Sequence, residues 1–176
     1  MKTAKNKIGK KAASIICDGD IIFIDGSTTT QYMEKYITEK KNITVITNNI
    51  GLVCHLSEYG VDVICLGGRV SEKPNMLGST ETVENVMKYK ADKMFFSSVG
   101  INENGEILSG DKYYLMYLMM AKNSKEVIYL ADHEKIQIDY PKVLFDLNRV
   151  DCIISDYDFK AEVKEKYKNT EFIYVK

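Results

Sequence analysis

Four hydroxyl side chains follow one another at the end of the stretch Asp25-Gly26-Ser27-Thr28-Thr29-Thr30. The stretch comes directly after the apolar run of residues 21–24, which is typical of a strand buried on both faces of a parallel sheet. Gly26 permits a tight turn, and Ser27 or Thr28 is a suitable cap for a following helix. The free N–H groups of such a helix start, its dipole and the hydroxyls together favour an anion. The chemistry expected here is the binding of a phosphate or a carboxylate.

Polar segments also follow the other predicted strands. They are Thr47-Asn48-Asn49, Gly67-Gly68-Arg69, Ser97-Ser98-Val99-Gly100 and Asp132-His133-Glu134-Lys135. Because ligands of open α/β sheets bind outside the carboxyl ends of the strands, these segments are expected to share one edge. Each also has a purely structural interpretation, since a Ser or Thr before a helix is commonly only a cap, and two glycines commonly form only a turn. Neither the GxxxxGK[ST] nor the GxGxxG phosphate-binding motif is present.

Apolar periodicity alternates between the strand and helix periods, which predicts the elements that position these segments. Strands are predicted at residues 20–24, 43–47, 61–66, 93–98, 127–131, 152–155 and 172–175. Helices are predicted at residues 3–17, 28–38, 50–59, 80–89, 111–124 and 160–167, and Asn104-Gly105 indicates a hairpin turn. This order predicts an α/β fold, a mostly parallel sheet flanked by helices. Without an evident linker, residues 1–176 are expected to form one domain.

Charge and hydropathy exclude several classes of partner. Lys and Arg number 24 against 25 Asp and Glu, for a net charge of −1, whereas a stand-alone nucleic-acid-binding protein usually has a basic face. The one local excess of positive charge lies in the first predicted helix. It is typical of a helix face that is exposed to solvent; the alternative is a linker next to a DNA-binding part. Its residues are Lys2, Lys5, Lys7, Lys10 and Lys11. No apolar run is long enough for a membrane span, and the N-terminal segment lacks the apolar core of a secretory signal. A cytoplasmic protein is expected.

The cysteines and histidines predict neither a metal site nor a cofactor. Cys17, Cys54, Cys65 and Cys152 lie far apart, no CxxC motif occurs, and the two histidines are also far apart. Cysteine is commonly a small core residue, so four buried structural thiols are predicted.

Taken together, these segments resemble the C-terminal sensor domain of DeoR-family transcriptional repressors. The resemblance rests on IGKKAASIICDGDIIFIDGSTTT, ITVITNN, VICLGGRV, LGSTETVENVMKYKADKMFFSSVGI and EVIYLADHEK, in this order and over nearly the whole chain. It implies a fold like that of ribose-5-phosphate isomerase and the CoA transferases. It also implies a regulator rather than an enzyme, with a phosphorylated sugar or a related anionic metabolite as its effector.

The same resemblance implies how this chain relates to DNA and to other copies of itself. Family repressors have a winged helix-turn-helix before the sensor domain, and residues 1–17 would be the helix that connects the two. This chain is therefore expected to be a sensor fragment that does not bind operator DNA directly, and to form a homo-oligomer.

The resemblance also implies the effector-binding residues. The phosphate loop falls on Asp25, Gly26, Ser27, Thr28 and Thr29, and the same pocket would be lined by Asn48, Gly67, Gly68 and Lys135. In the helix after the hairpin this sequence departs from the family, which usually has one or two glutamates and then a Lys-Arg pair. Tyr117 and Leu118 stand at the Lys-Arg positions, and Asp111 stands in for the acidic group. Asp111 and Tyr117 complete the predicted site.

The departure leaves alternative functions open. Residues 113–121 contain no charge, and a helix that is apolar all round is buried or covered by a partner. An oligomerisation module without a small ligand would fit this helix. A sugar-phosphate isomerase-like enzyme would need a general base and groups that stabilise an enediolate, for which Asp25, Asp111 and Lys135 are the candidates.

Overall fold

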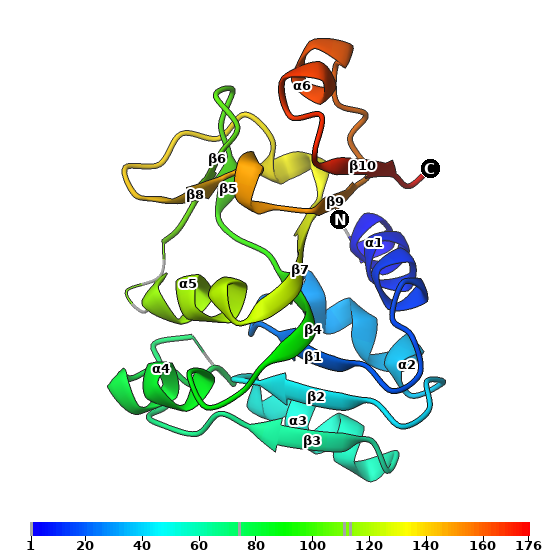
Figure 1. The fold of residues 1–176 in the computed structure, drawn as a ribbon, viewed down its shortest axis with the longest axis vertical. Coiled ribbons are helices and arrows are strands. Elements are labelled where there is room, and N and C mark those ends of the chain that lie inside the picture. Colours follow the sequence, from blue (N-terminus) through cyan, green and yellow to red (C-terminus); the bar gives the residue numbers. More distant parts are fainter. Residues whose placement is uncertain (1, 74, 111, 113) are drawn as a thin grey trace.

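The carboxyl ends of seven parallel strands meet at one edge of the main sheet, which has the order β10-β9-β7-β4-β1-β2-β3 (Figure 1). The computed structural model describes residues 2–73, 75–110, 112 and 114–176. The strands are β1 Ile21–Ile24, β2 Thr44–Thr47, β3 Asp62–Cys65, β4 Ala91–Phe96, β7 Ser124–Ala131, β9 Cys152–Ser155 and β10 Glu171–Tyr174. Each lies within about two residues of its predicted bounds, apart from the longer N-terminal part of β7. The predicted α/β class is confirmed.

A small antiparallel sheet with the order β5-β6-β8 adjoins the main one. Its strands are β5 Gly100–Ile101, β6 Glu106–Leu108 and β8 Val143–Asp146. The first two form the hairpin that Asn104-Gly105 predicts. No strand is predicted at β8, whose partner β6 lies more than thirty residues earlier in the chain.

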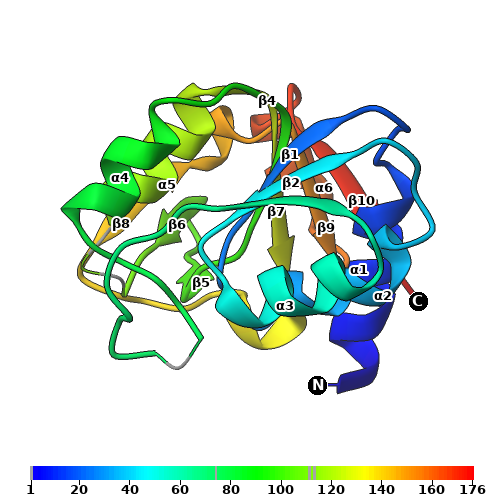
Figure 2. The ribbon, with the colours of Figure 1, turned by 90° about the horizontal axis from the view of Figure 1, so that it is seen from below.

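Helices cover both faces of the main sheet (Figure 2). On one face lie α1 Lys2–Ser14, α2 Glu34–Ile37 and α3 Ile50–Glu58; on the other lie α4 Thr80–Val86, α5 Tyr114–Lys122 and the small sheet. The short helix α6 Ala161–Lys166 precedes β10. Successive side chains of a strand point to opposite faces, so Ile22 and Ile24 join the core under α1 while Phe23 joins the core under α5.

The apolar helix α5 uses one side for the core. Met116, Tyr117 and Met120 are buried against the sheet, and Leu115 on the outer side is 48% exposed. The predicted burial of this helix is therefore confirmed for its inner side.

The helix predicted over residues 28–38 is wrong in its first half: a 3-10 turn, η1 Thr30–Met33, comes before the short α2. Ser27 Oγ donates to Asp25 Oδ1 at 2.8 Å and accepts a hydrogen bond from Thr30 N at 3.3 Å. Thr30 Oγ1 donates toward the backbone carbonyls of Asp25 and Ser27, at 3.0 and 2.9 Å. Such local bonds between side chains and backbone compete with a regular helix. The hydroxyl run therefore begins with a tight turn.

Gly67 and Gly68 pack against the start of α4. Both have positive φ, +67° and +101°. A Cβ atom on Gly68 would lie 2.2 Å from Thr82 Oγ1 and 2.5 Å from Ser79 Oγ. Thr82 Oγ1 also donates to the Gly67 carbonyl at 2.8 Å. These contacts favour the structural interpretation of the glycine pair, as a turn that brings its loop onto α4.

Gly68→Ala is expected to lower the free energy of unfolding by about 2–4 kcal/mol, because an alanine would suffer both the positive φ and the overlap with α4. Gly19→Ala is the matched control: Gly19 has φ +87° but nothing within 4 Å of its would-be Cβ. It should lose only about 1 kcal/mol. Urea unfolding of the two variants measures the difference, and equal losses would contradict the packing role given to Gly68.

Thr29→Val and Thr30→Val should change stability in opposite directions. Thr29 Oγ1 is buried and has no hydrogen-bond partner among the described residues, so an isosteric valine should raise the free energy of unfolding by about 1 kcal/mol. The hydroxyl of Thr30 is hydrogen-bonded, so its loss should cost about 1–2 kcal/mol. Urea unfolding without ligand checks both, and a destabilised Thr29→Val would refute the assignment of its hydroxyl as unsatisfied.

Candidate functional site

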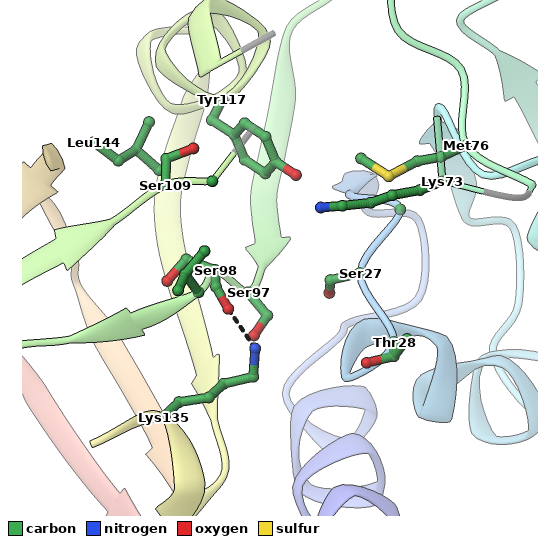
Figure 3. A pocket seen from close by; sticks show the side chains of 13 residues that line it. Ser27, Thr28, Lys73, Met76, Ser97, Ser98, Ser109, Tyr117, Lys135 and Leu144 are labelled. Carbon is green, nitrogen blue, oxygen red and sulfur yellow. Dashed lines mark hydrogen bonds between the residues drawn. The ribbon is translucent and has the colours of Figure 1, made fainter. Parts of the chain in front are cut away.

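A cavity of about 450 Å³ opens at the carboxyl-end edge of the sheet, between the loop after β1 and the segment around α5 (Figure 3). This volume is within the range of small-molecule sites. The lining residues come from several loops that are distant in sequence. They are Gly26, Ser27, Thr28, Lys73, Met76, Ser97, Ser98, Val99, Ser109, Gly110, Tyr117, Lys135 and Leu144.

The structure brings part of the predicted site together here. Among the predicted residues, those that line the cavity are Gly26, Ser27, Thr28, Tyr117 and Lys135. Asp25, Thr29 and Asn48 are 0% exposed and stand behind this lining. Gly67 and Gly68 contact α4 instead, and Asp111 lies outside the described residues.

Asp25 joins two walls of the cavity. Its Oδ1 accepts the Ser27 hydroxyl at 2.8 Å, and its Oδ2 accepts the Ser97 backbone N–H at 3.3 Å. Burial raises the pKa of Asp25 to about 6, against the lowering effect of these hydrogen bonds. The carboxylate therefore fixes the loop after β1 to the exit of β4, and the Ser27 hydroxyl is engaged within the turn.

Asn48 supports the cavity from behind. Its Nδ2 donates to the Leu77 carbonyl at 2.8 Å, and the Leu77 N–H donates to the Asn48 carbonyl at 2.8 Å. These bonds fold the loop after β3 back toward the sheet, so that Lys73 and Met76 of this loop line the cavity. A Cβ on Gly26 would lie 2.5 Å from Met76 Cγ, which shows how closely the two loops approach.

Two ammonium groups belong to the cavity. Lys135 Nζ donates to the backbone carbonyl of Ser98, and Figure 3 shows the amino group of Lys73 aimed into the cavity, toward Tyr117. Burial lowers the pKa of Lys135, the Asp132 carboxylate opposes this, and the positive charges of Lys5 and Lys73 add to the lowering. The described lining of the cavity thus contributes two ammonium groups, and the carboxylates Asp25 and Asp132 act on Lys135 from behind it.

Lys73 and Met76 are missing from the predicted site because they lie several residues beyond Gly67-Gly68-Arg69, the segment that follows the end of β3. A signal did exist for Ser97 and Ser98, which belong to the polar segment after β4. Nothing in the local sequence indicates the folding back of the loop, which depends on Asn48.

The described residues contain no group of three His, Cys, Asp or Glu that would hold a metal ion. Cys152 is buried, but Cys17, Cys54 and Cys65 are exposed, so the prediction of four buried thiols is wrong for three of them. Cys17 follows the end of α1, Cys54 lies on α3, and Cys65 ends the edge strand β3. None of the helices in the described part of the chain is long and apolar enough to cross a membrane.

Comparison with known proteins gives a family match over most of the chain. The model of the DeoR C terminal sensor domain matches residues 1–157. The HTH-type transcriptional repressor GlcR of Bacillus subtilis (strain 168) is 36% identical over 153 residues, which cover 86% of this chain and 59% of the repressor. The lactose phosphotransferase system repressor of Staphylococcus aureus (strain NCTC 8325 / PS 47) is 29% identical over 164 residues, 91% of this chain and 64% of the repressor. The chain thus spans about three fifths of the length of these relatives.

Solved structures share the fold at low sequence identity. Ribose 5-phosphate isomerase A from Methanocaldococcus jannaschii has a TM-score of 0.57 and 15% identity, with 77% of this chain and 54% of the isomerase covered. eIF2B beta from Chaetomium thermophilum has a TM-score of 0.63 and 19% identity, with 86% of this chain and 48% of that protein covered. The fold implied by the family resemblance, like that of ribose-5-phosphate isomerase, is confirmed, and the chain belongs to the DeoR C-terminal sensor domain family.

Proposed function

We propose that residues 1–176 form a single effector-sensing domain of a DeoR-type transcriptional regulator of sugar metabolism, and that a phosphorylated sugar or a related anionic metabolite binds in the cavity at the strand edge. The observation that carries the proposal is the convergence of Lys73 and Lys135 on a cavity whose described lining residues include no carboxylate. Ammonium groups that line a partly desolvated pocket favour a negatively charged ligand.

The remainder of the lining suits the hydroxyl groups and carbon skeleton of a sugar. Ser97 is 2% exposed, and its Oγ has no hydrogen-bond partner among the described residues, so it is available to a ligand hydroxyl. Thr28 presents a further hydroxyl, and Met76 and Leu144 add apolar surface. One relative is named the lactose phosphotransferase system repressor, which points to sugar metabolism as well.

Binding is a better account of this site than catalysis. An aldose–ketose isomerisation needs a general base within reach of the substrate. Asp25 is fully buried and hydrogen-bonded to Ser27 and Ser97, and it stands behind the described lining. The relatives GlcR and the lactose system repressor are named as repressors. We propose a non-enzymatic regulator without a cofactor, which acts as a homo-oligomer in the cytoplasm and binds DNA through an N-terminal part joined at α1.

The proposal predicts that phosphorylated sugars stabilise the chain and free sugars do not. Thermal shift and calorimetric titration are carried out with ribose 5-phosphate, glucose 6-phosphate, fructose 1-phosphate and fructose 6-phosphate, each beside its unphosphorylated sugar. At least one phosphate ester should raise Tm through preferential binding to the folded state. Equal shifts from free and phosphorylated sugars, or no shift from any of them, would refute the anionic-effector assignment.

Thr28→Val and Lys73→Gln should each raise the Kd of the most tightly bound of these phosphate esters about tenfold or more, because each substitution removes a polar contact to a charged group. Lys122→Gln is the control, an exposed lysine at the end of α5 that removes the same charge away from the cavity. Calorimetric Kd values provide the comparison. If Lys122→Gln raised the Kd as much as Lys73→Gln, the change in net charge alone would explain both effects and Lys73 would not contact the ligand.

A further inference from the structure

The helix α1 reaches the effector cavity through one side chain. Lys5 Nζ donates to Thr28 Oγ1 at 3.1 Å, and Thr28 lines the cavity. The Lys5 side chain is only 15% exposed, so it is not part of the solvated lysine face that the sequence suggests for this helix. Burial lowers the pKa of Lys135, and the positive charge of Lys5 lowers it further, so the two ammonium groups are close enough to interact.

Lys5 has a second partner on the other side. Asp132 is 1% exposed, and its Oδ1 accepts the Glu134 backbone N–H at 3.2 Å. Asp132 Oδ2 has no hydrogen-bond partner among the described residues and lies 3.8 Å from Lys5 Nζ. This distance is about 1 Å longer than a charge-assisted hydrogen bond. The Lys5 ammonium therefore stands between a hydroxyl of the cavity and a buried carboxylate oxygen that accepts no hydrogen bond from the described residues.

The backbone of α1 is also tied to the effector loop. A Cβ on Gly9, one turn after Lys5, would lie 2.6 Å from the carbonyl carbon of Tyr32, so the helix rests directly on η1. Next to this contact, Tyr36 Oη donates to Asn6 Oδ1 at 3.1 Å. Because η1 begins two residues after Thr28, these contacts connect α1 to the loop that lines the cavity.

We propose that Lys5 is a residue of the effector site, and that α1 senses occupancy of the site through the choice of Lys5 between Asp132 and the bound anion; this rests on the proposed function. A phosphate beside Thr28 offers Lys5 a stronger hydrogen bond than the neutral hydroxyl does. Without a ligand, Asp132 is the only opposite charge that contacts Lys5 among the described residues. A ligand shifts a conformational equilibrium by its difference in affinity for the two states, and these alternative partners provide such a difference.

The experiment measures binding and helix protection in the same samples. The probe is whichever of the four sugar phosphates named above binds the unmodified chain most tightly. Lys5→Gln should raise its Kd about tenfold or more, while the charge-preserving Lys5→Arg and the exposed control Lys7→Gln stay within about threefold. Hydrogen exchange of residues 3–9 should slow on addition of the probe in the unmodified chain and in Lys7→Gln, and not in Lys5→Gln.

Asp132→Asn should change the Kd of the probe in the opposite direction to Lys5→Gln. It removes the competing charge and keeps an oxygen that caps the 3-10 turn η2 His133–Lys135, so the probe should bind several-fold more tightly. Should Lys5→Gln fail to fold, this variant decides: a tighter Kd supports the proposal, and an unchanged or weaker Kd overturns it.

The outcomes separate this inference from the proposed function. Equal Kd values for Lys5→Gln and Lys7→Gln would overturn the role of Lys5 and leave the effector site in place. Failure of all four sugar phosphates to bind the unmodified chain would overturn the proposed function and the sensing role of α1 with it.

Discussion

One buried carboxylate holds the candidate site together. Asp25 accepts hydrogen bonds from Ser27 Oγ on its own loop and from Ser97 N at the exit of β4. The two loops meet because β1 and β4 are parallel neighbours, with Ile24 paired to Phe95. Burial raises the pKa of Asp25 to about 6, against the lowering effect of the hydrogen bonds that the carboxylate accepts. The shape of the cavity depends on this contact.

The four hydroxyl residues 27–30 have different roles in the structure. Ser27 and Thr30 build the turn, Thr29 points into the interior, and Thr28 is the threonine of this loop that lines the cavity. A row of hydroxyls in the sequence is therefore not a row of ligand contacts. The backbone of Gly26 through Thr28 and the Thr28 side chain are what the loop presents to a ligand.

The sheet could be predicted from the sequence because strands buried on both faces have continuous apolar runs, as in Ile21–Ile24. The prediction that a helix begins at residue 28 was wrong for a local reason. The apolar periodicity does not indicate that hydroxyl side chains will form hydrogen bonds with the backbone. Non-local contacts explain the other failures. The strand β8 exists because β6 pairs with it, and Lys73 reaches the cavity because Asn48 holds its loop at Leu77.

Of the two lysines that line the cavity, Lys73 lies at a position that the family resemblance does not indicate. The resemblance expects cations at positions 117 and 118, where this chain has Tyr117 and Leu118. The structure instead directs Lys73 toward Tyr117 from the loop after β3 (Figure 3). A lysine on a loop adds a charge to the same cavity without a charge inside α5, whose inner side packs in the core. This arrangement reconciles an apolar α5 with the anionic effector that we propose.

The shared fold does not by itself decide between an isomerase and a sensor, because unrelated functions occur on one fold. The chemistry of the edge does bear on that choice. An enzyme must favour a transition state and needs a base at the reacting carbon, whereas a sensor must favour one conformation over another. In this chain the carboxylates Asp25 and Asp132 are buried behind the loops. Asp25 accepts a hydrogen bond from Ser27 in the wall of the cavity, and Asp132 lies close to Lys5 of α1. Their placement supports the sensor that we propose rather than an enzyme.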